Sequence, residues 1–439
     1  MTQAAAREGL GTGGLWQDLR FRGLVAQSTD EALAGLLDRG GLVAYVGFDP
    51  TSDSLHVGNL LGILMLRRLQ EAGHRPIAVA GGGTGMVGDP GGRSEERSLL
   101  EGEELRANLE GIRTQLERLL DFEGGKGRPG ALLVDNAEWL SRLALLDFLR
   151  DVGKHFGVGQ MLGKESVRQR LSGREQGISY TEFSYMLLQA YDFLHLHDAF
   201  GCRLQVGGSD QWGNITAGVD LIRRVRGEQA FGLTTPLMLK ADGTKFGKSV
   251  AGTVWLDPRR TSPYALYQFL LQTEDSVVGA YLGYLTWLSQ GEIAELEADT
   301  ELRPALRRAQ RALAASVTRL VHGEAALAGA EAASTALFGG DLEALAPGTL
   351  LEVLADAPGS TVPRSLLDPP GWELVDALCR SGLVQSRSGA RRAIAEGGAS
   401  VNNRVVPEQD RRLGRGDLLH DRWIVLRRGK RSYHLLSFG

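Results

Sequence analysis

The sequence has little of what marks a membrane or secreted protein. Its 439 residues contain no run of about 20 apolar residues, the length that a membrane-spanning helix requires. The first residues, MTQAAAREGLGTGGLW, contain no apolar segment followed by a cleavage pattern, so we expect no signal peptide. The two cysteines, Cys202 and Cys379, lie far apart and lack metal-ligand spacing. We therefore expect a cytoplasmic protein with buried free thiols and no bound metal or prosthetic group.

The charges are unevenly distributed along the chain. Residues 372–439 include 13 Lys and Arg but 7 Asp and Glu, a balance of +6. Because the whole chain has a formal net charge of −4, the first 371 residues carry −10. An acidic body with a basic end indicates that the terminal part contacts a polyanion.

Short apolar runs alternate with helical patterns in the first half of the chain. The runs at 41–48, 75–82, 131–135 and 202–208 are typical of buried parallel strands, and helical spacing occurs at 59–73, 103–122 and 179–200. This alternation predicts an α/β domain with a doubly wound (Rossmann-like) parallel sheet over 21–254. The small polar residues 1–20 are expected to form a mobile tail.

The second half of the chain has a different organisation. Helical patterns without strand signals predict an α-helical domain over 255–338. Stretches rich in Pro and Gly, such as APGTL and LDPPG, indicate a partly ordered linker over 339–371. Residues 372–439 combine two short helices with strand-like stretches, which predicts a small, basic α+β domain.

Two glycine-rich stretches look like nucleotide-binding motifs but fit them poorly. ADGTKFGKS (241–249) ends like a P-loop, yet three residues separate its glycines where the motif needs four, and no helix follows. GTGMVG (83–88) matches the dinucleotide fingerprint, but Asp89-Pro90 follows where a helix should begin. We expect instead a turn that brings backbone close to a ligand at the carboxyl edge of the sheet.

YVGFDPTSDSLHVGNL (45–60) leads from a strand into a helix that begins near His56. The free backbone N–H groups at such a helix start favour anions, and Gly58 has no side chain to block a flat ring. A simple N-cap with a surface histidine is the alternative explanation on the local pattern alone.

HVGN followed by KFGKS resembles the two signature motifs of class I aminoacyl-tRNA synthetases. The text around them, including TEFSYMLLQAYDF (181–193) and CRLQVGGSDQWGNITAG (202–218), resembles the bacterial tyrosyl-tRNA synthetase family over nearly the whole chain. The resemblance implies a tyrosine–tRNA ligase, in which L-tyrosine and ATP give tyrosyl-adenylate and pyrophosphate. The tyrosyl group then passes to the 3'-terminal ribose of tRNA(Tyr). It also implies Mg²⁺ accompanying ATP, an anticodon-binding type of helical domain at 255–338, RNA binding by 372–439, and a homodimer.

The resemblance also assigns roles to residues. The catalytic set, around the ATP phosphates and the leaving pyrophosphate, is Thr51, His56, Asn59, Lys245, Lys248 and Ser249. The set for ATP and the adenylate is Gly47, Asp49, Gly58, Arg93, Arg97, Gly208 and Asp210. The set for tyrosine is Tyr45, Asp89, Tyr185, Gln189, Asp192, Gln205 and Gln211, with Tyr45 and Asp192 at the phenol hydroxyl. The RNA-binding face is expected to contain Arg387, Arg391, Arg392 and Arg404.

Some matches are less decisive. Asn59 stands where the family commonly has a histidine, and an amide cannot titrate. Asn136 and Trp139 match a region associated with the acceptor end of tRNA, but a turn and a core position explain them equally well.

Two other functions remain open from the sequence. A synthetase of the same fold for tryptophan is one, although an indole has no hydroxyl to satisfy Tyr45 and Asp192. A non-catalytic RNA-binding protein is the other, although His56, Lys245 and Lys248 are intact.

Overall fold

The computed structural model describes residues 14–87, 102–125, 128–164, 167–168, 178–249, 252–336, 340–355, 357–429 and 432–439. At Lys248 and Ser249 the description covers the backbone alone. The chain forms two compact units. The first comprises residues 1–261 and 269–321, and the second comprises 262–268 and 322–439.

The first unit is built on a sheet that has six strands among the described residues, in the order β1-β6-β5-β2-β3-β4. They are β1 (Gln27–Ser28), β2 (Val43–Phe48), β3 (Arg75–Ala80), β4 (Leu132–Asp135), β5 (Cys202–Gly208) and β6 (Phe231–Thr235). All neighbours in the sheet are parallel except β1 and β6. The predicted parallel sheet is thus confirmed, and each predicted strand lies within two residues of its observed bounds.

The strand order reverses beside β2. The chain passes from β2 to β3 and β4 on one side, then returns to place β5 and β6 on the other side. In such sheets a crevice opens outside the carboxyl ends of the strands at the reversal. β2 ends just before Asp49 and β5 just before Ser209, so these two strand ends define where a ligand site should lie.

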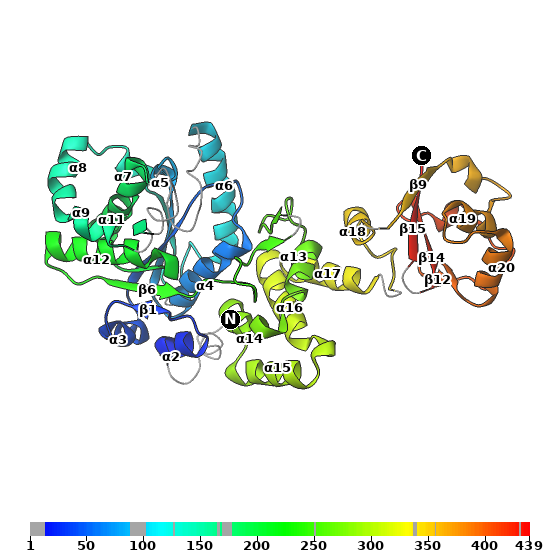
Figure 1. Cartoon of the computed structure of the whole chain (residues 1–439), viewed down its shortest axis with the longest axis horizontal. Helices are drawn as coiled ribbons and strands as arrows, with labels where there is room; N and C mark the ends of the chain where they lie inside the picture. Colours follow the sequence, from blue (N-terminus) through cyan, green and yellow to red (C-terminus); the bar gives the residue numbers. More distant parts are fainter. Residues whose placement is uncertain are drawn as a thin grey trace. The chain divides into compact units, whose positions relative to one another are not determined.

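Ten helices are described in this part of the chain, and some of them cover both faces of the sheet. The ten are α2 (Gly14–Phe21), α3 (Ala32–Arg39), α4 (Val57–Glu71), α5 (Gly82–Gly85), α6 (Gly102–Leu119), α7 (Ala137–Leu140), α8 (Leu145–Asp151), α9 (Val158–Leu162), α11 (Tyr180–Phe200) and α12 (Trp212–Arg226). In Figure 1, α4 and α6 lie on one side of the strands and α11 and α12 on the other, as a doubly wound fold requires. No helix among the described residues is long and apolar enough to cross a membrane.

Further helices follow the sheet: α13 (Pro263–Leu271), α14 (Asp275–Leu285), α15 (Gln290–Leu302) and α16 (Arg308–His322). Two buried arginines fix the end of α14 within the first unit. Arg22 and Arg68 both donate hydrogen bonds to the carbonyl of Thr286, at 3.1 and 2.6 Å, and Arg22 pairs with Asp18. Buried guanidinium groups are tolerated because they are paired in this way.

The second unit contains α17 (Glu324–Ala336), α18 (Pro347–Val353), β9 (Gly359–Val362), β10 (Trp372–Glu373), α19 (Leu374–Arg380), α20 (Arg387–Ala395), β11 (Ala399–Val401), β12 (Arg404–Val405), β13 (Arg412–Leu413), β14 (Trp423–Arg428) and β15 (Ser432–Phe438). Its larger sheet has the order β12-β11-β14-β15-β9. The stretch 339–371 differs from a linker, because β9 pairs in parallel with β15 and Leu350 and Val362 are buried in the core.

Candidate active site

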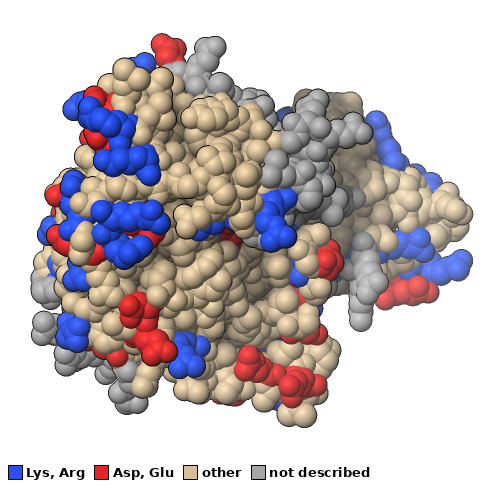
Figure 2. Space-filling model, turned by 60° about the vertical axis from the view of Figure 1, so that its left-hand side comes forward, with Lys and Arg blue, Asp and Glu red and all other residues tan. Residues whose placement is uncertain are grey.

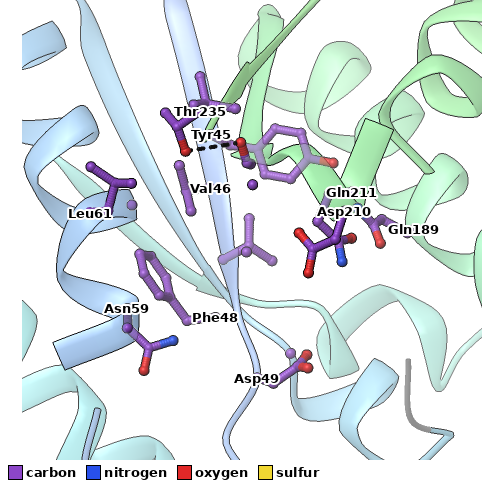
Figure 3. A pocket seen from close by; sticks show the side chains of 18 of the residues that line it. Tyr45, Val46, Phe48, Asp49, Asn59, Leu61, Gln189, Asp210, Gln211 and Thr235 are labelled. Carbon is purple, nitrogen blue, oxygen red and sulfur yellow. Dashed lines mark hydrogen bonds between the residues drawn. The ribbon is translucent and has the colours of Figure 1, made fainter. Parts of the chain in front are cut away.

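A cavity of about 300 Å³ opens at the carboxyl ends of β2 and β5. Residues from β2, the following loop, the start of α4, α11, β5 and the turn after it line the cavity (Figure 3). Its size is at the lower end of the range for small-molecule sites. Among the predicted site residues, the cavity brings together Tyr45, Gly47, Asp49, Thr51, His56, Gly58, Asn59, Tyr185, Gln189, Asp192, Gln205, Gly208, Asp210 and Gln211.

Tyr45 extends from β2 into the inner part of the cavity. Figure 3 shows its ring with the hydroxyl directed toward the side where Gln189 and Gln211 lie. The side chain is 2% exposed, and its hydroxyl forms no hydrogen bond with any described residue. Burial first, and then the nearby Asp192 carboxyl, raise the pKa of this hydroxyl well above its usual value, so it stays a neutral donor. A buried, unpaired donor facing a cavity suits a polar ligand group.

Asp192 lies on α11 and is held by two side chains from the region after β4. Trp139 donates its indole N–H to Oδ1 at 2.7 Å, and Asn136 donates its amide to Oδ2 at 2.9 Å. Burial raises the pKa of the Asp192 carboxyl to about 7, although both hydrogen bonds favour the ionised form. The two donors leave the carboxylate oriented as an acceptor.

The roles of Asn136 and Trp139 were left open by the sequence. Asn136 also accepts the backbone N–H of Gly83 at 2.7 Å and donates to Thr84 Oγ1 at 2.9 Å. It therefore connects the turn at α5 to Asp192. Their position in the chain could have indicated that they lie at the site. Both residues follow β4, and the carboxyl ends of parallel strands lie at one edge of the sheet.

Tyr185, Gln189 and Asp192 share one face of α11, as their spacing predicts, and all three line the cavity. Asn214 of α12 carries no sequence signal of a site, yet its amide donates to Gln189 Oε1 and to Gln211 Oε1, both at 3.0 Å. It therefore orients two of the predicted side chains. Gln205 is buried, and its Oε1 has no hydrogen-bond partner among the described residues.

Glycines keep the outer part of the cavity open. A Cβ built on Gly47 would have no atom within 4 Å, so the space above this strand residue is free for a ligand. A Cβ on Gly208 would come within 2.7 Å of Asp210 Oδ1. Glycine at position 47 therefore keeps the cavity open, and glycine at position 208 leaves room for the Asp210 side chain.

The HVGN segment forms the start of α4. His56 is the N-cap residue, and its backbone N–H is accepted by Asn59 Oδ1 at 3.0 Å. Asn59 thus closes the helix start with its oxygen, which leaves its amide N–H groups as donors. A Cβ on Gly58 would lie 2.8 Å from the His56 ring, so a side chain at position 58 would displace the imidazole.

The KFGKS segment begins in a tight turn, in which Lys240 donates its backbone N–H to Thr244 O at 2.8 Å and Leu239 pairs with Lys245. Phe246 packs against Phe269 and Tyr281, with ring centroids 4.8 and 4.5 Å apart. Gly247 has φ of +98°, and a Cβ there would be 3.3 Å from the backbone nitrogen of Gly58. The two signatures therefore meet through their glycines. The next residues form β7 (Lys248–Ser249), which pairs with β8 (Gly252–Thr253), so no helix follows.

Several predicted residues are not brought into the cavity by the described structure. Lys245 is exposed and is not part of the cavity lining. Asp89, Arg93 and Arg97 lie outside the described residues, as do the side chains of Lys248 and Ser249.

The predicted RNA-binding arginines fall into two groups in the second unit. Arg387 forms ion pairs with Glu373 and Asp376, and Arg404 pairs with Glu343 at 2.7 Å. Arg391 and Arg392 of α20 are exposed and form no ion pair with other described residues. Their charges are therefore more available to a polyanion than those of the paired arginines.

Comparisons with known proteins agree with this geometry. Residues 38–339 match the family described as tRNA synthetases class I (W and Y), and residues 354–436 match the C-terminal domain of the tyrosine–tRNA ligases. The tyrosine–tRNA ligase of Roseiflexus castenholzii is 55% identical over 95% of this chain and 98% of its own length. That of Staphylococcus carnosus is 46% identical over 97% of this chain and 100% of its own.

Solved structures give the same result. The crystal structure of a C-terminally truncated mitochondrial tyrosyl-tRNA synthetase from Aspergillus nidulans has a TM-score of 0.64 and 30% identity, covering 74% of this chain and 94% of that chain. A tryptophanyl-tRNA synthetase from Encephalitozoon cuniculi, covering 74% of this chain and 90% of that chain, is 13% identical with a TM-score of 0.52, so it shares the fold alone. Neither the tryptophan alternative nor the non-catalytic one is favoured. The chain therefore belongs to the class I aminoacyl-tRNA synthetases of the tryptophan and tyrosine group, and within that group to the tyrosine–tRNA ligases.

Proposed function

We propose that the chain joins L-tyrosine to the 3'-terminal ribose of tRNA(Tyr) by way of tyrosyl-adenylate. One observation carries the choice of amino acid: Tyr45 and Asp192 are both buried and line one cavity, and the Asp192 carboxyl is near enough to raise the pKa of the Tyr45 hydroxyl. A phenol hydroxyl donates one hydrogen bond and accepts another. Asp192 would accept from it and Tyr45 would donate to it. An indole or a phenyl ring would leave the Tyr45 hydroxyl without a partner and Asp192 with only its bonds from Trp139 and Asn136.

The rest of the cavity suits the remainder of tyrosine. Tyr185, Gln189 and Asp89 would hold the ammonium group, and Gln211 would lie near the carboxylate. Gln189 and Gln211 have their oxygens fixed by Asn214, which supports this assignment. Gln205 would support the pocket from within β5.

The first chemical step needs no covalent bond to the protein. A carboxylate oxygen of tyrosine attacks the α-phosphorus of ATP in line, the bond to the bridging oxygen breaks, and pyrophosphate leaves with the electron pair. Positioning and charge stabilisation must therefore supply the rate. The adenylate would lie along Gly47, Asp49, Gly208 and Asp210, where the open space above Gly47 admits it. Mg²⁺ would enter with ATP as part of the substrate.

Donors near the phosphates would act most strongly as negative charge moves to the pyrophosphate. Thr51 and His56, beside the start of α4, are the proposed donors on one side, with Asn59 completing the helix start. Lys245, Lys248 and Ser249 would close over the pyrophosphate from the other side, with Arg93 and Arg97 as further cations. The exposure of Lys245 and the left-handed Gly247 support a loop that can move toward the phosphates.

The tRNA would contact basic surfaces of both units. In the second unit, the exposed Arg391 and Arg392 are the best-placed of the predicted arginines, ahead of the paired Arg387 and Arg404. In the first unit, Lys164 lines a hollow beside α9 and α12 together with Arg223 and Arg224, which both pair with Asp220. Figure 2 shows Lys and Arg gathered in clusters on one face. Such contacts bind phosphates and give affinity more than sequence choice. We propose the helices at 255–338 as the anticodon-binding part.

A homodimer is the proposed assembly. Exposed apolar side chains concentrate on α8, α9 and the start of α11: Leu145, Leu146, Leu149, Val158, Leu162 and Tyr180. Leu146 is 78% exposed and Tyr180 is 75% exposed. Exposed apolar side chains grouped on neighbouring elements usually mark a protein contact.

The proposal is tested by transfer of labelled tyrosine to a tRNA(Tyr) transcript. We expect transfer that depends on ATP and on tyrosine, and none to a transcript with another identity. Transfer of tryptophan at a higher rate, or no transfer of any amino acid, would contradict the proposal.

A further inference from the structure

Arg260 lies beyond the second signature, in the turn before α13, yet its side chain reaches the loop of the first signature. Its guanidinium carbon is 3.7 Å from the ring centroid of Trp255. Nη1 donates to Asp53 Oδ1 at 2.6 Å and also to Ser52 Oγ. One side chain thus stacks on a neighbour in its own segment and binds two consecutive residues of the loop that includes Thr51.

The segment on which Arg260 stacks is itself fixed to the HVGN region. Val57 donates its backbone N–H to Val254 O at 3.0 Å, and Leu256 donates to Leu55 O at 2.8 Å. The rings of His56 and Trp255 lie 6.2 Å apart. The platform under Arg260 therefore cannot move independently of the start of α4, and the arginine extends this attachment to residues 52 and 53.

An ordinary surface ion pair is the simpler explanation. The Arg260 side chain is 35% exposed and that of Asp53 is 51% exposed, and isolated pairs at such exposure contribute little. Two features distinguish Arg260 from such a pair. The planar stack on Trp255 limits where the guanidinium can lie, and the two acceptors are adjacent in one loop. By contrast, the neighbouring Arg259 is 78% exposed and pairs with Asp257 of its own segment.

We propose that Arg260 is a positioning residue for ATP, which holds the 51–54 loop so that Thr51 and His56 face the phosphates. The inference rests on the proposed function of these two residues. Without Arg260 a smaller fraction of molecules has the loop in place, and the apparent affinity for ATP falls by that fraction. Tyrosine binding is spared, because Tyr45 and Asp192 are fixed from β2, α11 and the region after β4.

The test compares Arg260→Ala, Arg260→Lys and the matched control Arg259→Ala in tyrosine-dependent ATP–pyrophosphate exchange, using the full chain. Arg260→Ala removes the stacking of the guanidinium on Trp255 and the half-exposed ion pair with Asp53. The loss of these two interactions should raise KM for ATP by about five- to thirty-fold. KM for tyrosine should stay within about two-fold of the parent value, and Arg259→Ala should match the parent in both constants. Arg260→Lys keeps the charge but loses the planar stack, so its KM for ATP should lie between those of the parent and Arg260→Ala.

The outcomes separate the two proposals. Exchange absent from the parent protein would contradict the proposed function itself. An active parent with equal KM for ATP in Arg260→Ala and Arg259→Ala would overturn the role of Arg260. Equal rises in both KM values would overturn it as well, since that pattern indicates general loss of structure. If Arg260→Ala does not fold, Arg260→Lys decides by the same split between the two constants.

Discussion

Replacing Asp192 by alanine tests how the pocket distinguishes tyrosine from phenylalanine. The carboxylate is buried and receives hydrogen bonds from Trp139 and Asn136, which leaves it as the acceptor for a phenol hydroxyl. A hydrogen bond to a charged group is worth about 1.5–3 kcal/mol, and the donors left unpaired add about 1–3 kcal/mol. We therefore expect kcat/KM for tyrosine to fall by about two to four orders of magnitude.

Phenylalanine provides the comparison in the same variant. It makes no hydrogen bond to Asp192, so its kcat/KM in pyrophosphate exchange should fall by about ten-fold or less. Asp198→Ala is the control, because Asp198 lies on the same helix but pairs with the exposed Arg226 at 2.6 Å. That variant should leave both substrates unchanged. If kcat/KM for tyrosine and for phenylalanine fell equally in Asp192→Ala, this carboxylate would not be the group that recognises the phenol hydroxyl.

Three further predictions concern other parts of the molecule. Because burial raises the pKa of Asp192 to about 7, kcat/KM for tyrosine should decline as the pH falls through 7, while kcat/KM for phenylalanine stays constant. The raised pKa also makes the protonated carboxyl stabilise the fold fully below about pH 4, and this stabilisation is lost as the pH rises toward 7. Urea titrations at several pH values would detect the loss. Gly47→Ala should have a melting temperature within a few degrees of the parent protein, because the added Cβ would have no atom within 4 Å. The same Cβ would occupy the space proposed for the adenylate, so KM for ATP should rise at least about ten-fold. An unchanged KM for ATP would place the adenylate elsewhere. A chain ending at Gly323 should keep pyrophosphate exchange and lose most tRNA charging, because it keeps the cavity residues and lacks Arg391 and Arg392. A cut after Leu367 would instead leave β9 without β15. Full charging by the shorter chain would remove the second unit from the tRNA contact.

Local patterns were sufficient for the parallel sheet of the first unit, but they did not select the residues of the cavity. Apolar runs separated by helical spacing gave the sheet, and the spacing of Tyr185, Gln189 and Asp192 placed them on one face of α11. Both properties depend on residues close together in the chain. The family resemblance selected these three residues and the other predicted residues of the cavity.

Long-range pairings could not be predicted in the same way. Trp139 and Asn136 contact Asp192 from more than 50 positions away, and either residue alone is also compatible with a turn or a core. The same reason explains 339–371, where Pro and Gly suggested a linker but β9 pairs with the end of the chain. The contacts of Arg260 are equally hidden from local patterns, because its partners Ser52 and Asp53 lie more than 200 positions earlier in the chain.

The central claim is that the Tyr45 and Asp192 pair makes tyrosine the substrate, and amino-acid-dependent ATP–pyrophosphate exchange by the parent protein tests it most directly. Measured in parallel with tyrosine, tryptophan and phenylalanine, kcat/KM should be highest for tyrosine by at least about two orders of magnitude. A higher value for tryptophan, or comparable values for tyrosine and phenylalanine, would contradict the account.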